Sequence, residues 1–365
     1  MNLLFLTRYG RMGASSRCRL LQYAPLFEEA GHHVEIWPLV DDGYLRSLYA
    51  TGRRPWPQVF FGYTRRILKI RELRNFDAVI CEQEAFPYLP AACEAYVRRR
   101  CPRFFVDYDD AAYVRYKRWP FLRNKISRIM AQANGVVVGN PYLAQYARQF
   151  NPYVTIIPTV VDLAKYPERP PAKDSGVIRV AWIGTPVTAK LLIPLVPTLL
   201  RLQQEYKGLE FRFIGAGQGG LFDGLSAETP EWSEEQETKL LASCDLGIMP
   251  LHDDEFTRGK CGLKLIQYMA CSLPVVASPV GVNEEIVEHG RNGFLASSPE
   301  EWRAALSQLI VDWNLRQSMG HAVRQKVEAC YTLERGFAKW QEVIEGAAEE
   351  RGVMPSPEIA VGQRA

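Results

Sequence analysis

Short apolar runs alternate along the first half of the chain with longer segments that have helical spacing. Six runs have the length and composition of buried strands: residues 3–7, 33–37, 78–81, 103–106, 135–139 and 155–158. Between the first two runs, residues 18–30 have the spacing of a helix. Such an alternation predicts a parallel sheet that is covered by helices on both faces.

A second alternation starts at Val177, after a proline-rich stretch. Its predicted strands are residues 177–183, 210–214, 246–249, 274–277 and 293–296. The stretch "PERPPAKDSG" that precedes them has the composition of a linker. We therefore predict a first domain at 1–166, a linker at 167–176, a second domain at 177–332, a C-terminal helix at 333–350 and a disordered tail at 351–365. Two α/β domains joined in this way leave a cleft between the carboxyl ends of their sheets, which is the default binding site.

Composition narrows the class of protein. The 365 residues are 47% hydrophobic and 23% charged, which is typical of globular proteins. The eight cysteines form no CxxC pair and lie near no histidine cluster, so we expect reduced, mostly buried thiols rather than zinc ligands or disulfides. The first apolar run follows no basic stretch and is too short for a signal sequence or a membrane span, so a cytoplasmic protein is expected.

Charge is distributed unevenly between the two halves. Residues 1–165 contain 24 Lys and Arg against 14 Asp and Glu, whereas the remainder contains 20 against 27. Residues 53–74 combine seven cations with four aromatic residues: Arg53, Arg54, Arg65, Arg66, Lys69, Arg71, Arg74, Trp56, Phe60, Phe61 and Tyr63. This mixture favours contact with an anionic membrane or a phosphorylated substrate, and a solvated helix over core aromatics is the alternative. Nucleic acid is not expected, because no binding motif accompanies the charge.

The stretch "RGKCGLKLIQYMACSLPVVASPVGVNEE" at 258–285 has the pattern of a phosphate-binding loop. Lys260, Cys261, Gly262 and Leu263 lead into a short apolar helix, where free N–H groups, a bare backbone and a lysine would attract phosphate. An ordinary strand-to-helix turn is the alternative.

Two further loops of the second domain contain glycine where strands end. Gly184 and Thr185 end the first strand, and Lys190 near the next helix is a candidate anion contact. "GAGQGG" places glycines at 215, 217 and 220, but Gly224 and Pro230 follow where a dinucleotide motif needs a helix. We therefore interpret Gly215 and Gly217 as a loop that a base or ribose approaches, and count Trp232 in the same site.

In the first domain, polar and acidic residues follow three predicted strands. Gly13, Ser15, Ser16 and Arg17 form a loop before a helix, for which a plain turn is the alternative. Asp107, Asp109 and Asp110 end one strand. Asp109 and Asp110 are candidates to position sugar hydroxyls or the acceptor nucleophile, and Asp107 is a candidate to cap the loop. Glu82 and Glu84 end another strand and are candidates to line an acceptor pocket, with helix capping as the alternative. No ligand set for a metal converges on these acids.

Three segments carry a resemblance to a known family: "GLKLIQYMACSLPVVASPVGVNEEIVEHGRNGFL" from residue 262, "IPTVVDLAKY" at 157–166 and "RYGRMGASSR" after the first strand. Together they resemble the GT-B fold glycosyltransferases of the large retaining family 4, also called group 1, up to about residue 345. The resemblance implies two Rossmann-like domains that face each other across a cleft, with the last helix crossing back to the first domain. The first domain would bind acceptor and the second a nucleotide-sugar, without a metal or other cofactor.

Single positions both match this family and depart from it. Gly184, Gly262 and Gly281 fall on family glycines. The family's two glutamates, eight positions apart, are replaced by Gly259 and Gln267, and Gln267 can still hydrogen-bond a ribose hydroxyl. Thr185 stands at a family arginine, which leaves Lys190 and Lys260 as expected diphosphate cations.

The predicted function is sugar transfer from a nucleoside diphosphate sugar to a glycan, lipid-linked or other hydroxyl acceptor. The resemblance implies retention of anomeric configuration and a place in cell-surface polysaccharide or glycolipid synthesis. Asp109, Asp110 and Lys260 are the candidate catalytic residues. The expected location is the cytoplasm, including the inner face of the membrane. A noncatalytic nucleotide-binding subunit and a GT-B sugar-nucleotide epimerase are the alternatives.

Overall fold

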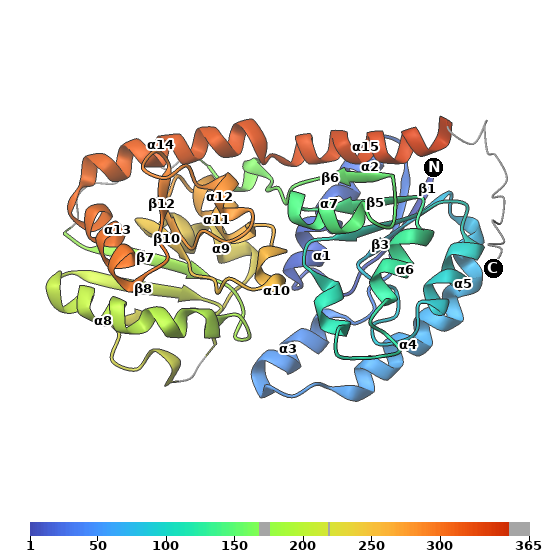
Figure 1. The fold of residues 1–365 in the computed structure, drawn as a ribbon, viewed down its shortest axis with the longest axis horizontal. Coiled ribbons are helices and arrows are strands. Elements are labelled where there is room, and N and C mark those ends of the chain that lie inside the picture. The colour runs from blue at the N-terminus through green and yellow to red at the C-terminus, as the bar shows by residue number, and fades with distance from the viewer. Residues whose placement is uncertain (168–175, 218–219, 350–365) are drawn as a thin grey trace, which may run out of the picture.

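The computed structural model describes residues 1–167, 176–217 and 220–349. They form two α/β domains that lie side by side, with the last helices running along one side of both (Figure 1). Most of the predicted linker and the whole predicted tail lie outside the described residues. Among the described residues, no helix has the length and apolar character needed to cross a membrane.

The first domain contains a parallel sheet in the order β2-β1-β3-β4-β5-β6. Its strands lie within two residues of those predicted: β1 Asn2–Leu6, β2 His33–Ile36, β3 Ala78–Glu82, β4 Phe104–Tyr108, β5 Gly135–Val138 and β6 Val154–Ile156. Leu3, Leu4 and Phe5 of β1 are fully buried, because helices cover both faces of the sheet. The alternation of short apolar runs thus predicted this sheet correctly.

The helices of this domain follow the strands, and one differs from its prediction. They are α1 Ala14–Arg19, α2 Ala24–Glu29, α3 Asp42–Thr51, α4 Trp56–Lys69, α5 Ala92–Arg100, α6 Lys125–Gln132 and α7 Pro141–Ala147. The single helix predicted at 18–30 is wrong, since the chain forms α1, a 3₁₀ turn at Leu21–Tyr23 and then α2. Pro25 in the first turn of α2 explains the break, because proline cannot donate the hydrogen bond that a continuous helix needs there.

The second domain repeats the architecture, with strand order β12-β11-β10-β7-β8-β9. Its strands are β7 Ile178–Ile183, β8 Leu209–Ile214, β9 Ala227–Glu228, β10 Leu246–Met249, β11 Val275–Ala277 and β12 Gly293–Leu295. Among the described strands, sequence reasoning missed only the edge strand β9. It has two residues, which is too short to show an alternation of apolar and polar positions. The helices are α8 Val196–Glu205, α9 Glu234–Ala242, α10 Glu255–Arg258, α11 Leu263–Ala270, α12 Asn283–Ile286, α13 Pro299–Val311, α14 Trp313–Cys330 and α15 Leu333–Glu349.

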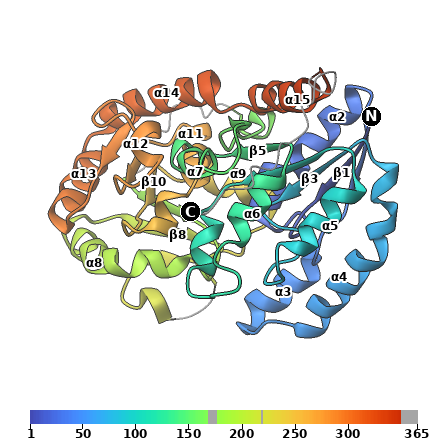
Figure 2. The same cartoon turned by 45° about the vertical axis from the view of Figure 1, so that its right-hand side comes forward.

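The last helix, α15, returns to the first domain, as the resemblance implied. It lies beside α2 in two views (Figures 1 and 2), where Phe337 packs its ring edge-on against Phe27 with centroids 4.9 Å apart. Trp340 and Ile344 are buried in the core of the first domain. The crossing is fixed by paired hydrogen bonds between Val161 and the chain at 331–333. The C-terminal helices α14 and α15 therefore connect the two domains.

Candidate active site

A cavity of about 600 Å³ lies between the two domains, where the carboxyl ends of their strands face each other. Fourteen of the residues predicted for the site line it: Ser15, Arg17, Asp109, Asp110, Gly184, Thr185, Gly215, Gly217, Trp232, Lys260, Cys261, Gly262, Leu263 and Gln267. Five others do not, namely Gly13, Ser16, Glu82, Glu84 and Lys190. The cleft expected from the two-domain pattern thus exists and collects most of the predicted residues.

The start of α11 forms the wall of the cavity on the side of the second domain. Gly262 precedes the helix with a positive φ of 69°, and a Cβ on it would collide with Ile286. The first N–H groups of α11 have no partner within the helix and carry the positive end of its dipole. With Lys260 beside it, this helix start has the features that phosphate requires.

The loop before α11 is docked onto the first domain. The Nδ2 of Asn140 donates to the carbonyl oxygens of Gly259 at 2.9 Å and Lys260 at 3.0 Å. The thiol of Cys261 contacts the carbonyl oxygen of Asp109 at 3.1 Å. A Cβ on Gly259 would lie 2.7 Å from both the Cβ and the backbone nitrogen of Ala111. The departure from the family at position 259 therefore has a physical reason: the neighbouring domain occupies the space of a side chain.

Lys260 and Asp110 form an ion pair across the cleft, with Nζ and Oδ1 3.3 Å apart. Burial raises the pKa of Asp110 to about 6, and the nearby Lys260 ammonium opposes that rise. Burial, together with the charge of Lys260, lowers the pKa of Lys264 to about 8. Two lysines and a carboxylate, all half-buried, thus share one part of the cavity. A bound anion would relieve the repulsion between the lysines.

The other acids on β4 have different partners. Asp109 accepts a hydrogen bond at 2.9 Å from Gln83, whose own backbone has a positive φ of 54°. Asp107 is fully buried and forms a two-pronged ion pair with Arg19, at 2.6 and 3.0 Å. The prediction that Asp107 caps the loop is wrong, because it ties α1 to the sheet instead.

The acids after β3 lie behind the cavity rather than in it. Glu82 accepts hydrogen bonds from Ser16 Oγ at 2.5 Å and from the backbone N–H of Arg8 at 2.8 Å, and burial raises its pKa to about 7. Ser16 lies in α1 rather than in the predicted loop, and Glu82 thus ties α1 and the backbone of Arg8 to the end of β3. Glu84 is buried against Lys125 at 2.7 Å, and it also accepts from Tyr116. Its predicted place in an acceptor pocket is thus wrong, since it belongs to an ionic cluster in the core.

On the side of the second domain, the glycine loop after β8 is packed tightly. Gly215 has a positive φ of 73° and donates its N–H to Pro230 at 2.9 Å. Only a three-residue 3₁₀ turn, Gly220–Phe222, follows this motif. A dinucleotide site would need a longer helix at this point, so the motif does not form the dinucleotide loop, and Gly215 and Gly217 line the cavity. Lys190 is exposed and lies outside the cavity, which removes it as a diphosphate contact.

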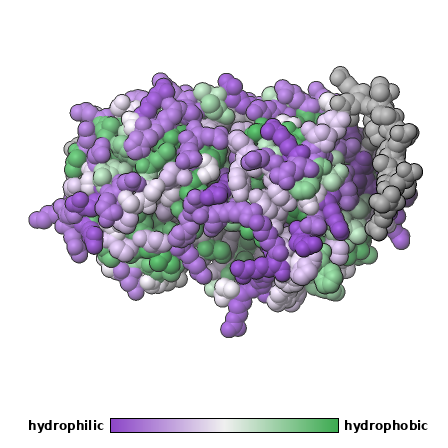
Figure 3. Space-filling view, in the orientation of Figure 1, coloured by the Kyte–Doolittle hydropathy of each residue, from purple (hydrophilic) through white to green (hydrophobic). Residues whose placement is uncertain are grey.

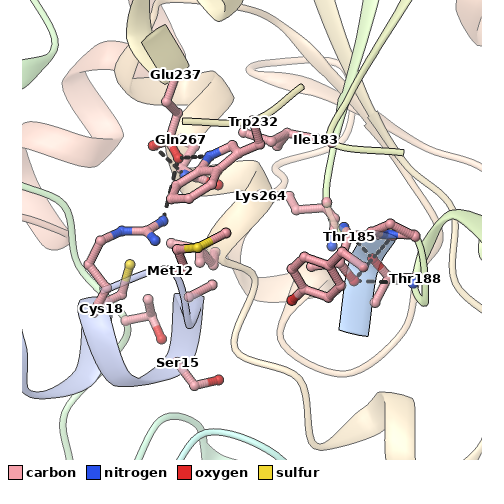
Figure 4. A pocket seen from close by; sticks show the side chains of 18 of the residues that line it. Met12, Ser15, Cys18, Ile183, Thr185, Thr188, Trp232, Glu237, Lys264 and Gln267 are labelled. Carbon is pink, nitrogen blue, oxygen red and sulfur yellow. Dashed lines mark hydrogen bonds and ion pairs between the residues drawn. The ribbon is translucent and has the colours of Figure 1, made fainter. Parts of the chain in front are cut away.

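Glu237 is one of several cavity residues that sequence reasoning missed, and it is the one with the most side-chain partners. It comes from α9, and its carboxylate meets Gln267 and Trp232 (Figure 4). It also accepts a hydrogen bond from Arg17. Its signal in the sequence is weak, because it follows two other glutamates in a first turn capped by Ser233 and resembles the solvated acids common there. Only the fold reveals that this one faces inward.

Comparisons with known proteins agree with this geometry. Residues 179–312 match the family model "Glycosyl transferases group 1". This segment is similar to the group 1 glycosyltransferases. N-acetyl-alpha-D-glucosaminyl L-malate synthase of Bacillus anthracis is 27% identical over 45% of this chain and 39% of its own length. D-inositol 3-phosphate glycosyltransferase of Paenarthrobacter aurescens is 33% identical over 35% and 31%. The matched part of the chain thus spans less than half of these relatives.

Solved structures confirm the GT-B fold over almost the whole chain. Sucrose-phosphate synthase from Thermosynechococcus elongatus superposes with a TM-score of 0.70 at 14% identity, covering 95% of this chain and 99% of that one. Anabaena HepE in complex with UDP and glucose gives a TM-score of 0.70 at 16% identity, covering 94% and 99%. The expectation of two Rossmann-like domains facing across a cleft is therefore confirmed.

Proposed function

We propose that this chain is a glycosyltransferase that holds a nucleoside diphosphate sugar on residues 184–285 and an acceptor on the first domain. The single observation that carries the proposal is the cavity between the domains, where the helix start at Gly262 and Lys260 face Asp109 and Asp110. The group 1 match covers this wall of the cavity, and a structural neighbour has been solved with UDP and glucose. In this proposal the nucleotide-sugar is a substrate, and no resident metal or other cofactor takes part.

The residues divide the chemistry between a leaving group and a nucleophile. Lys260 and the N–H groups of α11 stabilise the negative charge that develops on the departing diphosphate, and Lys264 adds to them. When the diphosphate binds, Lys260 exchanges Asp110 for phosphate, which leaves Asp110 and Asp109 to orient an acceptor hydroxyl. Docking of the loop at 258–262 onto Asn140 excludes water from this region. We infer retention of configuration, and synthesis of a cell-surface polysaccharide or glycolipid, from the family resemblance.

Thermal unfolding with UDP, GDP, ADP and NAD in parallel tests the donor site. A nucleoside diphosphate at about 100 times its dissociation constant is expected to add about 2.7 kcal/mol to the free energy of unfolding. The sugar donor that carries the stabilising nucleoside diphosphate should then release that nucleoside diphosphate when acceptor is present. A response to NAD alone, or to no nucleotide, contradicts the proposal.

One observation favours a second candidate, a noncatalytic nucleotide-binding subunit. The family's first glutamate has no equivalent on its own loop, because Gly259 is pressed against Ala111. Such a subunit would bind a nucleoside diphosphate but would not consume the corresponding sugar donor. A time course of nucleoside diphosphate release from the sugar donor separates the two candidates, because only the enzyme consumes the donor.

We further propose peripheral contact with an anionic membrane through α4 and the loop at 117–123. The exposed face of α4 carries Trp56, Phe60, Phe61, Ile67 and Leu68, which are 53–76% exposed, and Phe121 of the loop is 96% exposed. Figure 3 shows apolar surface where α4 lies, at the lower right of the view in Figure 1. Exposed apolar surface of this extent is rare on soluble monomers. The same segments and their flanks also carry exposed cations, namely Arg53, Arg54, Arg71, Arg74, Lys117, Arg118 and Arg123.

The structure also corrects the set of cations predicted at 53–74. Arg66 is buried and donates to the carbonyl oxygens of Thr7 and Trp37 at 2.6 Å and of Ala85 at 2.8 Å. It therefore stabilises the fold and cannot meet a membrane. The remaining cations and the aromatic face suit the headgroup region of a bilayer.

A double substitution, Trp56→Ser with Phe60→Ser, tests this contact. Wild-type protein is expected to sediment with vesicles that contain anionic lipid at low salt, and the variant to remain mostly in the supernatant because its apolar anchors are gone. Val311→Ser is the matched control, since Val311 is 66% exposed on the second domain. Equal sedimentation of all three proteins, or none by the wild type, would refute membrane contact.

A further inference from the structure

Glu237 lies at the centre of a hydrogen-bonded cluster behind the donor side of the cavity. Its side chain is 8% exposed, and four donors from four separate segments converge on it. Oε1 accepts from Tyr166 at 2.7 Å and from Gln267 at 2.6 Å. Oε2 accepts from Trp232 at 2.7 Å and from Arg17 of the first domain at 3.5 Å. A buried carboxylate with this many partners has a fixed position.

The position of Glu237 determines which way the Gln267 amide points. An ionised carboxylate can only accept hydrogen bonds, so Gln267 must turn its NH₂ group toward Glu237. Its Oε1 is then the group left for another donor. Gln267 lines the cavity, so this oxygen is an acceptor for a hydroxyl group of a bound ligand.

The same carboxylate also fixes the aromatic wall. The indole N–H of Trp232 is held by Glu237 (Figure 4). The guanidinium of Arg17 lies over the indole ring, 4.4 Å from its centroid. Trp232 is therefore locked between α9 and the first domain. Arg17 links the orientation of this wall to the approach of the two domains, because Glu237 and Trp232 lie across the cleft from it.

We propose that Glu237 is the positioning residue of the nucleotide site. It holds Gln267 with its carbonyl oxygen toward the cavity, where that oxygen accepts a ribose hydroxyl of the nucleoside diphosphate. This inference rests on the proposed donor site. The family resemblance leads one to expect a carboxylate at position 267. In this chain the carboxylate is that of Glu237 on α9, and it is hydrogen-bonded to the Gln267 amide. The pair of Glu237 and Gln267 replaces a single glutamate.

An exchange of the two side chains tests the proposal. The variants are Glu237→Gln, Gln267→Glu and the double exchange, and the probes are UDP and GDP with their 2′-deoxy and 3′-deoxy forms. Gln267→Glu is expected to weaken binding of the diphosphate at least tenfold, because it brings two carboxylates together where Gln267 now donates at 2.6 Å. Glu237→Gln is expected to remove the preference for ribose over at least one deoxyribose form. The double exchange should restore affinity to within about threefold of the wild type.

The control is Glu235→Gln, which removes an exposed acid from the same helix and should change none of these values. Additive effects of the two substitutions, or full affinity in Gln267→Glu alone, would overturn the positioning role. A wild-type protein that binds none of UDP, GDP and ADP would instead refute the proposed donor site. Binding by the wild type without any preference for ribose would refute only the role of Glu237 and Gln267.

Discussion

Replacement of Lys260 by alanine is expected to lower the rate of sugar transfer by about two to three orders of magnitude, the effect of removing one preorganised contact to developing charge. Lys260 lies between the helix start at Gly262 and Asp110, 3.3 Å from the carboxylate of Asp110. Its loss removes a cation expected beside the leaving diphosphate and also leaves the half-buried Asp110 without its partner. Steady-state rates and the melting temperature of the variant separate these two effects.

Lys190→Ala provides the matched control for this measurement. Lys190 belongs to the same domain, but it is exposed and does not line the cavity. We expect its rate to equal that of the wild type. A Lys260 variant that remains fully active, or a Lys190 variant that is equally impaired, would place the diphosphate elsewhere.

Replacement of Gly259 by alanine or glutamate is expected to lower sugar transfer at least tenfold while both domains remain folded. A Cβ at this position meets Ala111 of the other domain at 2.7 Å, which is closer than carbon atoms approach each other. We expect the two domains to separate, because this removes the clash with Ala111. Separation also breaks the hydrogen bonds from Asn140. The variant should therefore bind a nucleoside diphosphate on the second domain and fail in transfer.

Small-angle scattering checks the cause, because a more open protein has a larger radius of gyration. Gly346→Ala serves as the control, since a Cβ there meets nothing within 4 Å. Gly259→Glu restores the residue type that the family resemblance leads one to expect. Transfer that rises in this variant, with unchanged scattering, would show that the loop accommodates the side chain and would contradict the account.

The sequence predicted the fold well because the signals for it are local. Each buried strand is an apolar run of a few residues, and each glycine at a strand end marks a close approach. Gly184 and Gly262 therefore indicated the correct wall of the cavity. Pro25 could have predicted the break of the helix, because proline has no N–H to donate. The apolar spacing continues across Pro25, however, and favoured a single helix.

The parts of the site that sequence reasoning missed depend on pairs that are far apart in the chain. Glu84 reads as a strand-end acid, yet Lys125 neutralises it inside the core. Glu237 reads as a solvated helix acid, yet Arg17 approaches it from the other domain. The direction in which an acid faces depends on tertiary packing, and no local pattern encodes it. The glycine at position 259 likewise depends on tertiary packing, because Ala111 of the other domain lies where its side chain would be.

A crystal structure with the nucleoside diphosphate that stabilises the protein most tests the central claim directly. The account predicts that the diphosphate lies at the start of α11, within hydrogen-bond distance of the backbone N–H groups after Gly262 and of the Lys260 ammonium. The ribose should then contact Gln267. A nucleotide bound at any other place, with Lys260 still paired to Asp110, would contradict it.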